Sequence, residues 1–252
     1  MRRLAPLILI ALLAGCGGGA KEPAPPVVAV PTTTPEAVAP PIKIPAAPGR
    51  ARPVLPRFTT ARLDGRVALR ATPGGPALGG IGRWTEFGSP RVISVVGQRG
   101  NWLRVLVPER PNGATAWIPA SDARLGGTDV AVVVDRSART LTVRRDGRTL
   151  LRITVGVGQP EHPTPLGRYA VTDKLQMDGP GTDYGCCALA LTGHQPHLPQ
   201  GWTGLDRLAV HGTNRPWTIG AAGSLGCVHA ADRDLRRLMR VVPLGAPVFV
   251  RA

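Results

Sequence analysis

A histidine and a cysteine near the carboxyl-terminal end of the chain form its most informative pattern. His211 precedes Gly212, and thirteen residues after His211 the chain reads Ser224, Leu225, Gly226, Cys227, Val228 and His229. A thiolate attacks carbonyl groups far better than a thiol does, so a catalytic cysteine needs a nearby base or cation. Histidine serves either purpose near neutral pH. The pattern therefore indicates Cys227 as a nucleophile and His211 as its base.

The residues around this pair favour catalysis over the alternative of a buried cysteine and a structural histidine. Residues 207–210 predict a short strand that delivers His211 to a turn containing glycine. Gly226, directly before Cys227, permits close approach of the backbone to a substrate carbonyl. Backbone N–H groups near Gly226 and Cys227 could then stabilise an oxyanion.

Residues 210–213 and 224–228 resemble the signature of the L,D-transpeptidase catalytic domain, also called the YkuD domain. Residues 164–171 resemble the strand-entry segment of the same family, and the resemblance spans residues 129–252. It implies a cysteine acyl transfer on bacterial peptidoglycan stem peptides. Cys227 would attack the carbonyl of the third stem residue and expel D-alanine, with His211 as general base and then general acid. A neighbouring stem amine would complete a 3→3 cross-link, whereas water would make the enzyme a carboxypeptidase.

The same resemblance implies roles for residues around the pair. The carbonyl of Gly212 would orient His211. Contacts to the substrate or the oxyanion would come from Ser224, Gly226, His229 and Tyr184. Two positions depart from the family pattern: Leu225 stands where members often have histidine, and His229 stands where they usually have arginine or asparagine. A histidine at 229 keeps a hydrogen-bond donor but makes its charge depend on pH.

The amino-terminal end predicts export and attachment to a membrane. Residues 1–15 read as a lipoprotein signal peptide, with a basic start, an apolar stretch and small residues before Cys16, the expected lipidation site. An ordinary signal peptide or a transmembrane anchor is the alternative. Residues 16–57 are rich in proline and alanine and predict an extended tether without a packed core. The expected location is outside the cytoplasm, facing the cell wall or periplasm.

Residues 58–126 predict a small, strongly bent antiparallel barrel. The expected strands lie at residues 67–70, 91–96, 102–107 and 116–119, with glycine- and proline-rich turns between them. Residues 69–70, 100–105 and 113–118 resemble a bacterial SH3-like domain. Such a domain would place the enzyme on wall peptide or glycan, or brace the catalytic part.

Residues 127–252 also predict a mainly β structure, which the family resemblance makes a β-sandwich with one short helix. Strands are expected at residues 130–135, 140–145, 149–157 and 168–172, and the helix at residues 232–240. Its apolar face would carry Leu235, Leu238 and Met239. Residues 173–206 are rich in glycine and proline and predict a long irregular loop that covers the acyl-donor site.

Histidines and cysteines in and around that loop leave two questions open. A zinc site could be drawn from His194, His197, His211, Cys227 and His229, but the spacings of common zinc sites are missing. We therefore expect neither a metal nor another cofactor. The adjacent Cys186 and Cys187 could form a disulfide or pack as two thiols, since an exported compartment permits either.

The net charge of +15 favours anionic partners. An exported protein without a nucleic-acid-binding motif has little access to nucleic acid, so wall polymers, stem-peptide carboxylates and phospholipid surfaces fit better. Three functions remain: a lipid-anchored L,D-transpeptidase, an L,D-carboxypeptidase or other thiol hydrolase, and a non-catalytic wall-binding lipoprotein. The sequence leaves the oligomeric state undetermined.

Overall fold

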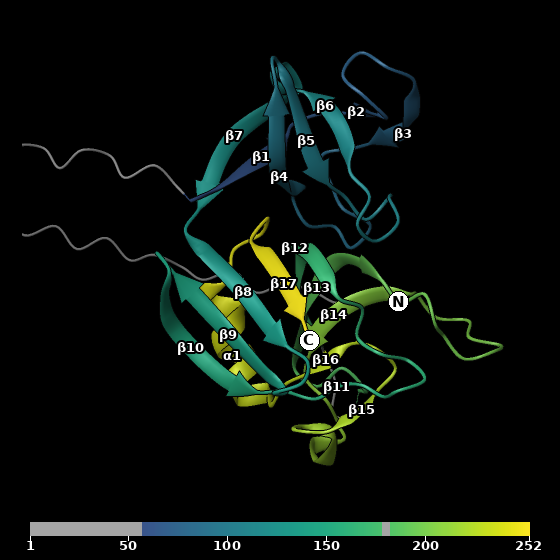
Figure 1. Ribbon diagram of the computed structural model, residues 1–252, viewed down its shortest axis with the longest axis vertical. Helices are drawn as coiled ribbons and strands as arrows, with labels where there is room; N and C mark the ends of the chain where they lie inside the picture. The colour runs from purple at the N-terminus through teal and green to yellow at the C-terminus, as the bar shows by residue number, and fades with distance from the viewer. Residues whose placement is uncertain (1–56, 178–181) are drawn as a thin grey trace, which may run out of the picture. The chain divides into compact units, whose positions relative to one another are not determined.

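The computed structural model describes residues 57–177 and 182–252 (Figure 1). The predicted signal peptide, the lipidation site Cys16 and the tether up to residue 56 lie outside the described residues. The described chain is mainly β with a single α-helix, α1 (Asp232–Val241), which confirms the predicted fold class. Within these residues, no helix is long and apolar enough to cross a membrane.

The first seven strands form one antiparallel sheet in the order β3-β2-β6-β5-β4-β1-β7. They are β1 (Phe58–Leu63), β2 (Val67–Arg70), β3 (Ala77–Ile81), β4 (Val92–Arg99), β5 (Trp102–Leu106), β6 (Ala116–Pro119) and β7 (Ala123–Thr128), with a 3-10 turn, η1 (Ala120–Asp122), before β7. Apolar side chains on one side of the sheet form a separate core that includes Leu63, Leu103 and Ile118. The expected four strands are present. β1, β3 and β7 were not expected.

The remaining strands form an eight-stranded mixed sheet in the order β10-β9-β8-β17-β12-β13-β14-β16, and a small parallel pair of β11 and β15. Their bounds are β8 (Val130–Asp135), β9 (Thr140–Arg145), β10 (Arg148–Thr154), β11 (Val157–Gly158), β12 (Gly167–Gln176), β13 (Cys187–His194), β14 (Arg207–His211), β15 (Ala222–Ser224), β16 (Val228–His229) and β17 (Pro247–Arg251). A 3-10 turn, η2 (Pro216–Thr218), precedes β15.

Strand β12 joins the two halves of the eight-stranded sheet. Its first four residues pair with β17, and its residues from Val171 on pair with β13, with a register shift between Val171 and Asp173. An irregularity of this kind bends a strand and lets one sheet turn over a common core. That core takes side chains from both halves, among them Val132, Tyr169 and Leu189.

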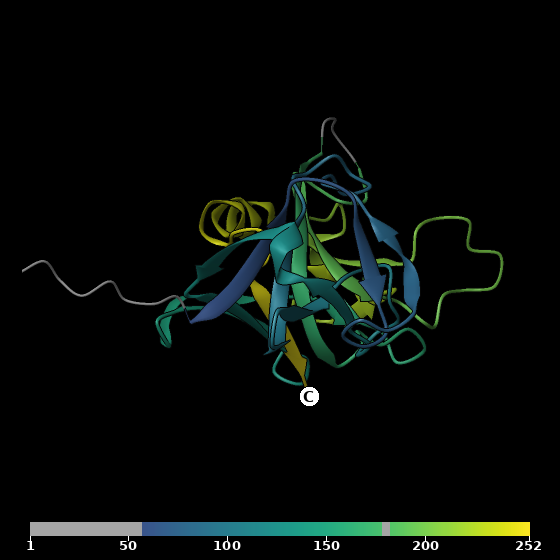
Figure 2. The same ribbon diagram turned by 90° about the horizontal axis from the view of Figure 1, so that it is seen from above.

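The structure corrects the prediction of one long irregular loop over residues 173–206. Strand β12 continues to Gln176, and residues 187–194 form the central strand β13, which is buried along almost its whole length. The irregular segment between β13 and β14 is therefore confined to residues 195–206. In both views this segment extends outward, on the opposite side of β12 and β13 from helix α1 (Figures 1 and 2).

Helix α1 covers the core beside β13 and β14. The predicted helix is confirmed, with one further residue at its end, and its buried side chains are Leu235, Leu238 and Met239, as the apolar periodicity indicated. Asp232 and Asp234 lie in the first turn, where carboxylates interact favourably with the helix dipole. Asp232 also reaches the candidate active site.

Candidate active site

His211 and Cys227 line the same cleft, which has a volume of about 360 Å³. β14 ends at His211, and β16 begins directly after Cys227. The two strands pair in parallel and place His211 opposite His229. The sheet thus brings together two segments whose sequence spacing alone could not establish proximity, and Tyr184 and Ser224 line the same cleft.

The imidazole of His211 is buried, with a relative exposure of 5%. Its Nδ1 lies 2.5 Å from the carbonyl oxygen of Gly212, which can only accept a hydrogen bond, so Nδ1 carries the proton. Nε2 is therefore the nitrogen that can take a proton from a thiol. Burial and the neighbouring His229 lower the pKa of His211 to about 4, although the Gly212 carbonyl and Asp183 oppose this shift.

The thiol of Cys227 also favours its uncharged form. Burial raises the pKa of Cys227 to about 11, while a backbone contact with Ala209 opposes the shift. Sγ lies 3.8 Å from the carbonyl oxygen of Arg207, an acceptor that a thiol can use and a thiolate cannot. At pH 7 the pair is therefore a neutral thiol and a neutral imidazole, so His211 acts by removing the proton during attack on the substrate.

We expect the pH dependence of Cys227 alkylation to reveal this neutral resting state. Iodoacetamide reacts with the thiolate, so its rate at Cys227 should rise about tenfold per pH unit from pH 7 to 10 and level off only near the pKa of about 11. The same protein unfolded in urea should level off near the ordinary cysteine pKa of 9.0. Peptide mapping of the alkylated residue measures both curves, and a native curve that is flat above pH 7 would instead reveal a standing thiolate.

Ser224 shapes the turn before the nucleophile. Its hydroxyl donates to the carbonyl of Cys227 at 2.6 Å and accepts from the N–H of Gly226 at 3.1 Å. Ser224 is buried and acts within the turn. The N–H of Gly226, which was expected to contribute to an oxyanion hole, is thus bonded to Ser224 in this structure.

His229 has a defined hydrogen-bond arrangement. The hydroxyl of Thr218 donates to the carbonyl of Arg215 at 2.7 Å, so its oxygen accepts from Nδ1 of His229 at 2.8 Å. Nε2 of neutral His229 is then an acceptor. Burial and the charge of Arg215 lower the pKa of His229, so the ring is uncharged at pH 7. Its single N–H, on Nδ1, donates to Thr218. The two histidine rings lie 4.7 Å apart, centre to centre.

Tyr184 also lies against His211, with 4.7 Å between ring centres. Burial is the main reason why the pKa of Tyr184 is raised, with Cys227 and Asp183 adding to the shift, so the phenol keeps its proton. The side chain remains 44% exposed, and it therefore faces the space that a substrate would occupy. Leu225 also lines the cleft, where it presents an apolar surface.

Cys186 and Cys187 form a disulfide between adjacent residues at the start of β13. The N–H of Cys186 donates to Oδ1 of Asp232 at 3.2 Å, and the N–H of Gly212 donates to the carbonyl of Cys187 at 3.1 Å. A Cβ atom at position 212 would collide with Asp232. Asp232 at the start of helix α1 and the backbone of Cys186 and Cys187 thus hold the backbone whose carbonyl orients His211.

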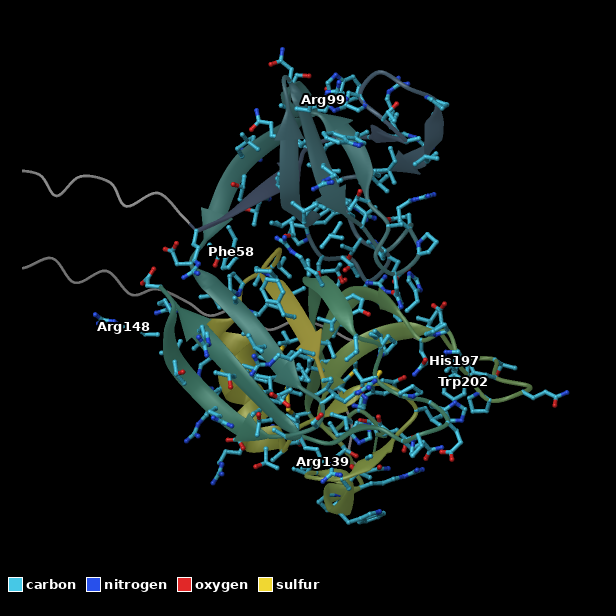
Figure 3. All side chains as sticks on the ribbon, viewed as in Figure 1. Phe58, Arg99, Arg139, Arg148, His197 and Trp202 are labelled. Atoms are coloured by element: carbon cyan, nitrogen blue, oxygen red, sulfur yellow. A yellow bond between two sulfur atoms is a disulfide. The ribbon has the colours of Figure 1, made fainter. Side chains whose placement is uncertain are left out.

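His194, one of the histidines considered as zinc ligands, has other partners. Nδ1 of His194 lies 2.8 Å from Asp206, and its Nε2 lies 2.6 Å from the carbonyl of Pro108. His197 and Trp202 lie on the segment that extends between β13 and β14 (Figure 3). Within residues 57–177 and 182–252, no group of three or more potential ligands could hold a metal ion.

Three residues with clear roles in the site carry no local sequence signal. Thr218 fixes the tautomer of His229, Asp232 holds the backbone near Gly212, and Gln195 contacts the turn before Cys227. Each acts on a partner that is distant in the chain or belongs to another element. Only the folded arrangement reveals them.

Sequence comparisons agree with this chemistry. Residues 129–250 match the family model of the L,D-transpeptidase catalytic domain, YkuD. YkuD of Bacillus subtilis is 28% identical over 119 residues, which are 47% of this chain and 64% of that protein. L,D-transpeptidase 1 of Mycobacterium tuberculosis is 26% identical over 212 residues, which are 80% of this chain and 79% of that protein. The chain thus spans slightly less than two thirds of the length of YkuD.

Among solved structures, an L,D-transpeptidase from Mycobacterium smegmatis aligns with a TM-score of 0.42 and 20% identity, covering 64% of this chain and 90% of that one. An L,D-transpeptidase from M. tuberculosis H37Rv aligns with a TM-score of 0.40 and 25% identity, covering 56% and 67%. The similarity to this family rests on the sequence match over residues 129–250, slightly less than half of the chain.

Proposed function

We propose that residues 129–250, which match the family model of the L,D-transpeptidase catalytic domain, form such a domain, and that the protein joins peptidoglycan stem peptides by 3→3 cross-links. The observation that carries this proposal is the cleft shared by Cys227 and His211, in which Nδ1 of His211 is committed to Gly212. That arrangement leaves one ring nitrogen to take the thiol proton. It supplies the nucleophile and the base that acyl transfer from a peptide requires.

The reaction would proceed through a thioester. Sγ of Cys227 attacks the carbonyl carbon of the third stem residue while Nε2 of His211 takes the thiol proton. The tetrahedral intermediate expels the amine of D-alanine, which receives that proton from His211. The side-chain amine of a neighbouring stem then attacks the thioester and gives up a proton to His211. Collapse of the second intermediate returns the proton to the sulfur and leaves the new amide bond.

The oxyanion of each intermediate needs donors that are not used elsewhere. We assign this role to the backbone N–H of Cys227 and the phenol of Tyr184, because the N–H of Gly226 bonds to Ser224. The raised pKa of Tyr184 keeps its hydroxyl proton available as a donor. Neutral His229, with Nε2 as an acceptor, would receive a hydrogen bond from a substrate N–H.

The proposal extends to the location of the enzyme. Residues 1–15 would direct export, and lipidation at Cys16 would attach the protein to a membrane through two acyl chains. The proline-rich tether would then carry the catalytic domain to the cell wall or periplasm. Cross-linking there would contribute to wall organisation and cell shape.

We also propose that residues 58–126 form an SH3-like module. The antiparallel sheet with its own apolar core supports this. The match to the mycobacterial L,D-transpeptidase 1 covers more of the chain than the catalytic domain alone. The side chain of Asn112 forms hydrogen bonds with the backbone N–H and carbonyl of His194. These contacts favour a module that braces the catalytic domain, in addition to any binding of wall polymers.

A product analysis distinguishes cross-linking from the other functions. Incubation of the full-length protein with a tetrapeptide stem should release D-alanine and yield a 3→3 linked dimer, both seen by mass spectrometry. Free tripeptide without dimer would identify an L,D-carboxypeptidase or another thiol hydrolase, because water would then be the acceptor. The absence of any acyl adduct on Cys227, with stem or with a carbapenem, would identify a non-catalytic wall-binding protein.

A further inference from the structure

The side chain of Gln195 contacts the turn that carries the nucleophile. Gln195 follows β13 directly and has a relative exposure of 5%. Its Nε2 lies 3.0 Å from the carbonyl oxygen of Leu225, 3.1 Å from that of Pro163 and 3.2 Å from that of His162. One buried amide thus joins the turn before Cys227 to the segment that precedes β12.

The rest of Gln195 is held as firmly as its amide nitrogen. Oε1 accepts a hydrogen bond from the N–H of His197 at 3.1 Å, and the backbone N–H of Gln195 donates to the carbonyl of Asp206 at 2.7 Å. Both ends of the segment between β13 and β14 are therefore fixed to this residue. That segment contributes Leu198 and Trp202 to the lining of the cleft.

Gly226 packs against the same side chain. Gly226 has a φ of +118°, and a Cβ atom built on it would collide with Nε2 of Gln195. The glycine before Cys227 was expected to give a substrate carbonyl room. Instead, the space at its α-carbon is filled by Gln195.

We propose that Gln195 is a positioning residue for acyl transfer by Cys227. By holding the carbonyl of Leu225, it sets the direction of the peptide units that follow. The direction of these units determines where Sγ and the N–H of Cys227 lie relative to the carbonyl of the acyl-donor substrate. The inference rests on the proposed function. Its chemical requirement is an uncharged donor, because three carbonyl oxygens face Nε2 and would repel a carboxylate at that position.

The first test compares two reactions of the same sulfur. Gln195→Glu in the full-length protein should slow acylation of Cys227 by a carbapenem about 100-fold, since misplacement by about 1 Å can cost that much. Alkylation of Cys227 by iodoacetamide needs no oriented carbonyl and should change less than about threefold. Gln195→Met removes the hydrogen bonds and keeps the length of the side chain, and it should also slow acylation. It tests the inference if Gln195→Glu does not fold. Gln200→Glu, on the exposed part of the same segment, is the matched control and should leave both rates unchanged.

Equal slowing of acylation and alkylation would overturn the inference, because it would indicate general disorder of the site. Unchanged acylation in both Gln195 variants would overturn it as well. Failure of the proposed function looks different: the wild-type protein itself would then form no acyl adduct on Cys227, while alkylation would still proceed.

A second test addresses the contact with Gly226. Gly226→Ala should slow acylation strongly in the wild-type background, where the new methyl group meets Nε2. In the Gln195→Ala background the same substitution should cost several-fold less, because the colliding atom is gone and only the unfavourable φ remains. Identical costs in the two backgrounds would show that the two residues act independently, and would contradict the role assigned to Gln195.

Discussion

Replacing Cys227 with alanine is expected to abolish covalent adduct formation and to lower the rate of D-alanine release by at least about 10⁴-fold. The substitution removes the only atom of the protein that forms a bond to the acyl group in the proposed mechanism. Cys227 is also the one free cysteine among the described residues, since Cys186 and Cys187 are joined to each other. Intact-mass measurement after incubation with a carbapenem, combined with an assay of released D-alanine, tests both parts.

The control for this experiment is the double variant Cys186→Ala with Cys187→Ala. Their bonds near Gly212 come from the backbone, which alanine keeps, so loss of the disulfide alone should at most reduce the rate and should leave the adduct on Cys227. Mapping of the wild-type adduct to Cys186 or Cys187 would contradict the site assignment. Persistence of turnover in Cys227→Ala would contradict the mechanism.

Strands with an alternating or apolar pattern could be predicted from the sequence. β2, β6, β8 and β9 lie at the predicted residues, because their β-branched and apolar residues face a core on at least one side. β3 and β7 were missed since each contains two adjacent glycines, which weaken the local strand signal and leave pairing to decide the structure. β17 begins with proline, which argues against a strand unless its neighbours are known.

The central strand β13 shows why a buried strand can be hidden. Nearly all of its residues are buried, so no alternation of apolar and polar residues marks it. Its alanines and Gly193 have low strand propensity, and glycine- and proline-rich segments flank it. At Gly193 a Cβ atom would collide with Tyr169, so the glycine that weakens the prediction is required by packing against β12.

The reacting residues of the site are visible in the sequence, whereas the residues that position them are not. Cys227, His211 and Gly212 lie in a short motif with recognisable chemistry. Gln195 contacts carbonyl oxygens that lie 30 to 33 residues away along the chain, and main-chain oxygens have no signature in any sequence. Charge states are hidden for the same reason, because burial sets the pKa values of His211 and Cys227.

Replacing His211 with alanine is expected to slow acylation of Cys227 by about 10²- to 10⁴-fold at pH 7, the usual contribution of a general base. The thiol has a pKa of about 11 in the folded protein, so without a base only about one molecule in 10⁴ carries a thiolate at pH 7. Removal of the imidazole should therefore leave a slow reaction that depends on this small fraction.

The pH profile separates the loss of a base from damage to the fold. Because the pKa of His211 is about 4, wild-type acylation should stay nearly constant from pH 6 to 9 and fall to half only near pH 4, as His211 becomes protonated. In His211→Ala the rate should instead rise about tenfold per pH unit up to the thiol pKa, so the two proteins should differ least at alkaline pH. His197→Ala, an exposed histidine on the segment between β13 and β14, should keep the wild-type profile. A constant rate in His211→Ala across this range would show that another group activates Cys227, because the neutral thiol has no other route to pH-independent attack.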